Sequence, residues 1–223
     1  MTLKLIQTGD GSFTLFVPEL NEHYHSVFGA VNESRHIFIN AGFNYFKNIT
    51  GQINILEIGF GTGLNAFLTL FEARKNKQKV NYTTIEPNPL DKDIFSKLNY
   101  FDFIKDKNAE KIFLRLHQSD WNKHAEISKG FFLLKIKSKI EDVALDPDKY
   151  HLVYFDAFAP EVQPELWTEQ IFQKVYNSMR NNGVLVTYSA KGMVKRNMIF
   201  AGLKVEKLPG PKGKREFIRA EKK

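Results

Sequence analysis

The stretch that decides the predicted fold is INILEIGFGTG, residues 53–63. Its first six residues are mostly apolar, as in a strand buried on both faces of a sheet, and Glu57 is the one acid among them. Gly59, Gly61 and Gly63 then alternate, and glycine lets the backbone turn sharply and approach a ligand closely. Leu64 stands where a dinucleotide-binding loop has its third glycine, so the spacing favours an adenosyl ligand without a pyrophosphate. The loop therefore predicts S-adenosylmethionine as cofactor, with a purely structural turn as the alternative.

The composition is that of an ordinary soluble chain with one sizeable core: 223 residues, 43% hydrophobic and 26% charged. It has no cysteine, which excludes disulfides, thiolate metal ligands and thiol catalysis. No apolar run approaches the roughly 20 residues that cross a bilayer, and the N-terminus lacks the apolar centre of a signal peptide. The histidines lack metal-ligand spacing, so we expect no metal. The lack of cysteine, of a membrane span and of a signal peptide predicts a cytoplasmic protein without membrane attachment.

Strand-like and helix-like segments alternate along the chain. The predicted strands cover residues 53–58, 81–86, 131–137, 151–156 and 183–189, and the predicted helices cover residues 64–74, 91–103, 108–117, 163–177 and 194–201. Residues 203–208 and 216–220 are expected to form a closing antiparallel pair. This alternation predicts an α/β fold with a mostly parallel sheet and helices on both faces. We expect one domain over residues 51–223, with residues 1–50 as a small N-terminal addition packed on its core.

Two acids stand at the ends of predicted strands. Glu86 follows the second strand, and the ends of neighbouring parallel strands meet at the ligand crevice. A carboxylate there can accept both hydroxyls of a ribose, although an acid at a strand end is often simply exposed.

Asp156 ends an almost wholly apolar strand, so its carboxylate needs a partner if it is buried. Full proton abstraction from an alkylammonium by an ordinary Asp is uphill by roughly 8 kcal/mol. We therefore expect Asp156 to bind and aim an amine that is already neutral, and to stabilise the ammonium that forms on methyl transfer. A donor nitrogen on the cofactor is a further possible partner, and a structural acid or helix cap is the alternative.

The positive charge is concentrated near the C-terminal end. Residues 190–223 hold eleven Lys or Arg and three Asp or Glu, whereas the whole chain has a net charge of +7. Such a segment is either a solvated, solubilising end or a footprint for the phosphate backbone of a nucleic acid. The residues predicted to contact RNA phosphates are Lys191, Lys195, Arg196, Lys212, Lys214 and Arg215.

Several segments together resemble one known family. They read YHSVFGAVNESRHIFINAGF (24–43), LEIGFGTGLNAFLTL (56–70), DAFAPEVQPELWTEQIF (156–172) and GPKGKREFIRA (210–220). They resemble, in the correct order, the methyltransferases that complete 5-methylaminomethyl-2-thiouridine at the tRNA wobble position. The resemblance implies a class I methyltransferase (Rossmann-like) sheet of seven strands with the last antiparallel. It also implies methyl transfer from S-adenosylmethionine to the aminomethyl nitrogen of the modified uridine in the tRNA anticodon loop.

The resemblance also suggests the organisation of the protein. Some family members carry a fused flavin-dependent oxidase, but this chain has no second dinucleotide motif. We therefore expect the stand-alone form, with an upstream enzyme on a separate chain supplying the amine. A monomer is expected because no long apolar surface stripe is evident.

The resemblance implies roles for individual residues. Those matching the cofactor site are Glu57, Gly59, Gly61, Gly63, Asn65, Glu86 and Asp156. Asp156 matches the acid beside the transferred methyl group and is the expected catalytic residue. Glu33 matches an acid bordering the substrate, with a helix cap as its other possible role, and Tyr24 and His25 are further candidates for the pocket wall. Phe158, Trp167 and Tyr188 are candidates to flank the target base.

One position departs from the family pattern. Lys139 stands where the family tends to have an Asp that accepts a hydrogen bond from the adenine amino group, and Lys is not an acceptor. Either backbone groups around Ile140 bind the adenine, or Glu141 or Asp142 substitutes, or the register of the match differs. Two other functions remain open on the same sheet: an aminopropyl- or small-amine-transferring enzyme, and a non-catalytic RNA-binding module.

Overall fold

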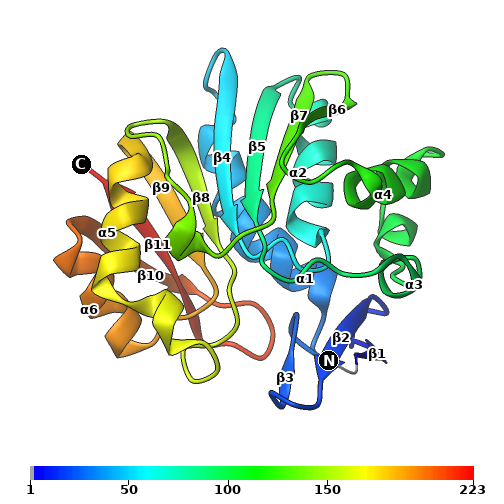
Figure 1. Cartoon of the computed structure of the whole chain (residues 1–223), viewed down its shortest axis with the longest axis horizontal. Helices are drawn as coiled ribbons and strands as arrows, with labels where there is room; N and C mark the ends of the chain where they lie inside the picture. Colours follow the sequence, from blue (N-terminus) through cyan, green and yellow to red (C-terminus); the bar gives the residue numbers. More distant parts are fainter. Residues whose placement is uncertain (1–2) are drawn as a thin grey trace.

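The computed structural model describes residues 3–223 and has a long, mostly parallel sheet at its centre (Figure 1). Among the described residues this sheet has eight strands in the order β10-β11-β9-β8-β4-β5-β7-β6. Their bounds are β4 (Gln52–Ile58), β5 (Lys79–Ile85), β6 (His124–Ser128), β7 (Phe131–Ile136), β8 (Tyr150–Phe155), β9 (Met179–Thr187), β10 (Leu203–Pro209) and β11 (Glu216–Lys222). The strands from β7 to β9 are parallel, whereas β6, β11 and β10 pair antiparallel.

Helices cover both faces of the sheet, as predicted. The longer helices are α2 (Leu64–Lys75) and α4 (Ala109–Gln118) on one face and α5 (Glu169–Ser178) and α6 (Gly192–Phe200) on the other (Figure 1). Strand β8 has a continuous apolar sequence because both of its faces pack against helices. Leu152 and Tyr154 pack with α2 and α4, while Val153 and Phe155 pack with α5 and α6. Both faces of the strand are thus buried, which is typical of the interior of a parallel sheet.

The N-terminal residues form a small sheet of their own. Its strands are β1 (Lys4–Gln7), β2 (Phe13–Val17) and β3 (Glu22–His23), and short helical segments follow as α1 (Ala30–Ser34), a π-helical turn (Arg35–Asn40) and a 3₁₀ turn (Phe43–Phe46). Val31, Phe38 and Phe43 are fully buried in the same core as α2. Residues 30–46 therefore share the main core, and the division at residue 50 stays a prediction.

The helix predicted over residues 91–103 is wrong, because the structure has only the short helix α3 (Lys92–Phe95) and a 3₁₀ turn (Tyr100–Phe103) there. Asn99 lies between them, and its side chain accepts a hydrogen bond from the Phe13 N–H at 2.8 Å and donates one to the Gly11 carbonyl at 3.0 Å. These bonds to the N-terminal sheet hold the backbone out of the helix, so tertiary contacts override the local pattern.

Other differences are smaller. The helix predicted from residue 163 begins as a 3₁₀ turn (Pro164–Trp167), and α5 proper begins after Thr168, whose side chain caps it. Strand β9 begins at Met179 rather than at residue 183, and β6 was not predicted. β6 forms a hairpin with β7 and adds an eighth strand to the seven expected. No helix of residues 3–223 is both long and apolar enough to cross a membrane.

The register of the parallel strands brings the predicted site residues together. Ile58, Ile85 and Phe155 are level in β4, β5 and β8. The residue after each strand is therefore at the same edge of the sheet, and these residues are Gly59, Glu86 and Asp156. Backbone hydrogen bonds continue past the strand ends, from Gly59 N–H to the Ile85 carbonyl and from Asp156 N–H to the Ile58 carbonyl, both at 3.0 Å.

Candidate active site

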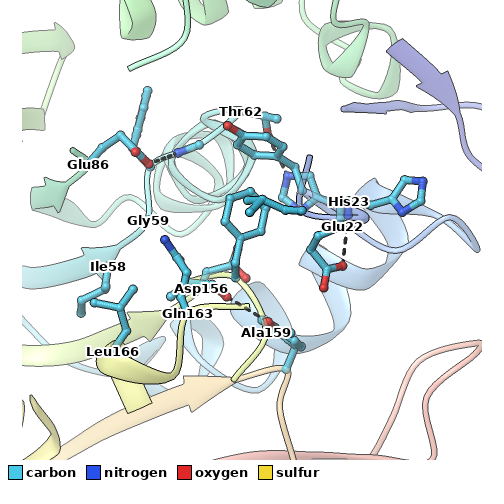
Figure 2. A pocket seen from close by; sticks show the side chains of 18 of the residues that line it. Glu22, His23, Ile58, Gly59, Thr62, Glu86, Asp156, Ala159, Gln163 and Leu166 are labelled. Atoms are coloured by element: carbon cyan, nitrogen blue, oxygen red, sulfur yellow. Dashed lines mark hydrogen bonds between the residues drawn. The ribbon is translucent and has the colours of Figure 1, made fainter. Parts of the chain in front are cut away.

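A cavity of about 460 Å³ lies at this edge of the sheet (Figure 2). Glu86 and Asp156 both face it, on either side of Gly59, and Gln163 and Leu166 approach it from the loop after β8. The N-terminal segment contributes Tyr24, His25 and Glu33, and the loop between β10 and β11 contributes Lys214. A volume of this size is typical of sites for small organic ligands.

The glycine loop needs its glycines at two positions. Gly59 has φ +91°, and a Cβ on it would lie 2.5 Å from the Asp156 carbonyl oxygen. Gly61 has φ +48°, and a Cβ on it would lie 3.0 Å from the Tyr24 ring. Gly59, Phe60, Gly61 and Thr62 line the cavity, whereas Gly63 lies outside its wall as the residue before α2. The loop thus brings bare backbone to the ligand, as the sequence predicts.

Glu86 is fixed against this loop. One carboxylate oxygen accepts the Gly61 N–H at 3.0 Å and the other accepts the Asn88 N–H at 2.9 Å. Burial raises the pKa of Glu86, although the two backbone hydrogen bonds act to lower it. Each oxygen keeps a lone pair for a further donor, such as a ribose hydroxyl. The glycine cradle and this carboxylate together fit the sugar of an adenosyl cofactor.

The adjoining wall is the turn after β7. Lys139, Ile140 and Glu141 line the cavity, and Asp142 does not. The Lys174 ammonium donates to the carbonyls of Ile140 and Glu141, each at 2.7 Å, and holds the turn in place. Of the two acids considered as substitutes for the family's Asp, only Glu141 therefore reaches the cavity.

Asn65 connects the fully buried carboxyl group of Glu57 with the partly buried carboxyl group of Asp156. Its amide nitrogen lies 2.8 Å from Asp156 Oδ2 and 3.3 Å from Glu57 Oε1, and its oxygen accepts a hydrogen bond from the Ser34 hydroxyl at 2.5 Å. Glu57 is fully buried, and burial raises the pKa of its carboxyl group well above the ordinary value. Glu57 and Asn65 do not line the cavity. Their assignment as cofactor contacts therefore stays a prediction.

Asp156 differs from Glu57 because it faces the cavity. Burial raises the pKa of its carboxyl group to about 7, the Asn65 amide acts to lower it, and the charges of Glu33 and Lys214 act in opposite directions. Its carboxyl group therefore exchanges a proton near neutral pH, while Asn65 fixes its orientation.

An ion pair between distant parts of the chain also lines the cavity. Lys214 Nζ lies 2.8 Å from Glu33 Oε1 and 4.0 Å from the centre of the Tyr188 ring. The other Glu33 oxygen accepts the Ser26 N–H at 2.9 Å. Glu33 is only 6% exposed, whereas the Lys214 side chain is partly exposed, so the carboxylate is the more shielded partner of this pair. Lys214 thus lies inside the site, whereas the sequence analysis assigned it to the RNA-facing surface.

Aromatic side chains complete the wall. The rings of Tyr24 and Phe158 meet edge to face at 5.0 Å, and the Tyr188 hydroxyl donates to the Ala157 carbonyl at 2.9 Å. His25 shares a hydrogen bond of 2.6 Å with the Thr62 hydroxyl, and burial lowers its pKa to about 4, so it is neutral at pH 7. Trp167 is fully buried behind the wall and donates to the Phe158 carbonyl, which excludes it as a platform for a base.

The remaining basic residues lie elsewhere. Lys191 and Arg215 line a second hollow beside the cavity, and Lys191 pairs with Glu161. Lys195, Arg196 and Lys212 line neither space.

Gln163 and Leu166 also line the cavity and are absent from the residues predicted for the site. They follow Pro160 in a loop that begins directly after Asp156, and proximity to a predicted catalytic residue was the one signal for them.

Comparisons with known proteins agree with this geometry. Residues 104–223 match the model of a family described as S-adenosyl-L-methionine-dependent methyltransferases. The chain is 28% identical over 95% of its length to the tRNA 5-methylaminomethyl-2-thiouridine biosynthesis bifunctional protein MnmC of Leptospira interrogans, of which it covers 34%. The chain thus spans about a third of the length of this curated relative.

Two solved structures are also similar. The crystal structure of MnmC2 from Aquifex aeolicus superposes with a TM-score of 0.83 at 25% identity, over 100% of this chain and 70% of that one. Spermidine synthase from Thermotoga maritima shares the fold at a TM-score of 0.56 and 14% identity, over 100% of this chain and 72% of that one. The family match covers more than half of the described chain, and the glycine cradle with Glu86 fits an adenosyl group. This chain therefore belongs to the S-adenosyl-L-methionine-dependent methyltransferases, with S-adenosylmethionine as its cofactor.

Proposed function

We propose that this chain methylates the aminomethyl nitrogen at C5 of a modified uridine in the tRNA wobble position, giving 5-methylaminomethyl-(2-thio)uridine. The observation that carries the proposal is Asp156, an acid facing the cavity between the glycine loop and the Glu33–Lys214 pair. The similarity to a bifunctional protein named for the biosynthesis of this nucleoside supports it.

The chemistry of the amine explains the charged groups. When bound, S-adenosylmethionine supplies a methyl group on a positively charged sulfur that departs as a neutral thioether. The amine lone pair forms the new N–C bond, so the nitrogen becomes positively charged. Asp156 can stabilise this ammonium, and Asn65 keeps the carboxylate aimed at one point. Positioning of this kind supplies roughly 7–11 kcal/mol of the barrier lowering in well-oriented reactions.

The raised pKa of Asp156 also makes proton transfer from the alkylammonium to its carboxylate less unfavourable. With an alkylammonium pKa near 10 and an Asp156 pKa of about 7, proton transfer to Asp156 is uphill by roughly 4 kcal/mol rather than roughly 8. Asp156 can therefore accept the proton released after methylation and pass it to solvent as the product leaves. Lys214 balances Glu33, which keeps the cavity from accumulating two uncompensated carboxylates.

The target uridine would reach the cavity from a loop. A wobble base can leave the stack of an anticodon loop without breaking a duplex. Phe158 and Tyr188 line the cavity as partly buried aromatic rings, and we assign them the faces of the extruded base. Tyr24, between Gly61 and Phe158, separates the base from the glycine loop.

The test is transfer of a labelled methyl group from S-adenosylmethionine to tRNA from cells that lack this enzyme, followed by nucleoside analysis. We expect label on the aminomethyl group of the wobble uridine. Absence of label on that tRNA, with cofactor binding intact, would contradict the proposal and direct the search to small amines, including aminopropyl transfer. Absence of cofactor binding would instead indicate an RNA-binding module.

A further inference from the structure

A second hollow, of about 340 Å³, lies directly beside the cavity. Ala159, Tyr188 and Lys214 line both spaces, so the two adjoin at these residues. A nucleotide whose base lies in the cavity would therefore have its sugar–phosphate chain close to this hollow. The groups that line it decide what it can bind.

Helix α6 begins at the hollow. Lys191 lines it and immediately precedes Gly192, the first residue of the helix. No side chain caps this helix, and no acid lies in its first turn. The N–H groups of the first turn and the helix dipole thus favour an anion at this end. Arg196 Nη1 lies 3.3 Å from the position of a Cβ on Gly192, which places its guanidinium over the same turn.

Ser189 provides an independent observation. It lines the hollow, is only 5% exposed, and its hydroxyl has no hydrogen-bond partner among the described residues. Buried polar groups without partners are rare, since each one loses its hydration without compensation. An oxygen of a bound anion would satisfy this hydroxyl.

Some of the charged groups around the hollow have an ion-pair partner and others have none. Lys191 pairs with Glu161, and Glu216, which also lines the hollow, pairs with Lys207 at 2.7 Å. Within residues 3–223, Arg196 and Arg215 form no ion pair. Arg215 lines the hollow, so its guanidinium is available to an incoming phosphate, to which Arg can donate two parallel hydrogen bonds.

We propose that this hollow binds one phosphodiester of the RNA chain, next to the nucleotide whose base enters the cavity. The Ser189 hydroxyl, the first-turn N–H groups of α6 and the Arg215 guanidinium hold its oxygens. This inference rests on the proposed function for the identity of the RNA. The sequence predicts RNA contacts by a set of basic residues, whereas this inference assigns one phosphodiester to one defined site. An uncharged serine, Ser189, is a principal contact in that site.

The experiment uses RNA hairpins with the sequence of an anticodon stem-loop that carry 5-aminomethyluridine at the wobble position. One hairpin is unaltered, and two others carry a single uncharged methylphosphonate, either 5′ or 3′ of that nucleotide. Binding of each is measured to the wild-type chain and to the Ser189→Ala and Arg215→Ala variants. Lys111→Ala is the matched control, because Lys111 is an exposed lysine on α4, at the other edge of the molecule (Figure 1).

We expect one of the two methylphosphonates to weaken wild-type binding about tenfold. The same substitution should weaken binding to Ser189→Ala and Arg215→Ala less than about twofold, because the contact is already lost, whereas Lys111→Ala should behave as wild type. An equal effect of each methylphosphonate on all four proteins would overturn the subsite. Arg215→Ala keeps the test decisive if Ser189→Ala does not fold.

Methyl transfer to the unaltered hairpin is measured in the same wild-type samples. Transfer without a phosphate-specific effect overturns the subsite and leaves the proposed function in place. A phosphate-specific effect without transfer overturns the proposed function and supports the subsite. No binding of the hairpin by the wild-type chain would overturn both.

Discussion

The two halves of the cavity are built in different ways. The half that we assign to the cofactor consists of backbone from one short loop, the Glu86 carboxylate and the turn at Ile140, all of them next to the ends of β4, β5 and β7. The half that we assign to the target amine consists of side chains, with Asp156, Glu33 and Lys214 coming from the middle and from both end regions of the chain. The first half is specified by local sequence, and the second by tertiary structure. Substitutions should therefore separate cofactor affinity from turnover.

The largest separation is expected at Asp156. Asp156→Asn removes the charge that stabilises the developing ammonium, and we expect turnover to fall about 10²–10³-fold while the cofactor dissociation constant changes less than about threefold. Methyl transfer and calorimetric titration measure the two quantities.

Glu57→Gln is the matched control, because Glu57 bonds the same Asn65 amide but does not line the cavity. We expect it to change turnover less than about threefold. Normal turnover in Asp156→Asn would contradict the division between the halves.

The pH dependence of stability and of turnover should follow from the carboxyl group of Asp156. The folded pKa of Asp156, about 7, lies above the unfolded value near 4, so its protonated form stabilises the fold. This stabilisation is complete below about pH 4 and is lost as the pH rises through about 7. The free energy of unfolding of wild type should therefore fall relative to Asp156→Asn over this interval, by up to roughly 4 kcal/mol.

Urea unfolding of both proteins at several pH values measures this difference, in which the contributions of the buried histidines cancel. Wild-type turnover should rise through about pH 7 as the carboxylate forms. A pH-independent difference in stability would mean that Asp156 has an ordinary pKa.

The Glu33–Lys214 pair tests the target half alone. Lys214→Met leaves the buried Glu33 carboxylate unpaired, and we expect the KM for RNA to rise about tenfold with unchanged cofactor affinity. The double variant with Glu33→Gln should lose less than the sum of the single losses, because the two residues act as a pair. Strict additivity in this cycle would show that Lys214 acts on RNA phosphates only.

The smallest effect is expected in the cofactor half. Gly61→Ala places a Cβ against the Tyr24 ring in a left-handed backbone conformation and should weaken cofactor binding about fivefold to tenfold, with near-normal turnover at saturating cofactor. Gly51→Ala is the control, because Gly51 has φ +104° but no atom within 4 Å of its added Cβ. It should carry backbone strain without affecting the cofactor. Equal cofactor affinities in the two variants would remove Gly61 from the binding site.

The sequence predicted the parts of the site that follow directly from strands. Gly59, Glu86 and Asp156 each come after an apolar run of recognisable length, and parallel register then makes them neighbours. The sequence did not predict the position of Lys214. Its ion-pair partner is Glu33, near the other end of the chain, and no periodic pattern in the sequence links the two residues. Asn99 is a similar case, because its bonds to Gly11 and Phe13 divide a segment that has a helical pattern.

The position of β11 has a consequence for synthesis on the ribosome. β11 is made after β10, yet it pairs with β9 on one side and β10 on the other. Until residues 216–222 have emerged, β9 is therefore an open edge with unpaired backbone groups and an apolar sequence, which is the kind of surface through which nascent chains aggregate. A pause in translation before this point would expose that edge to chaperones, while the glycine loop could already have folded.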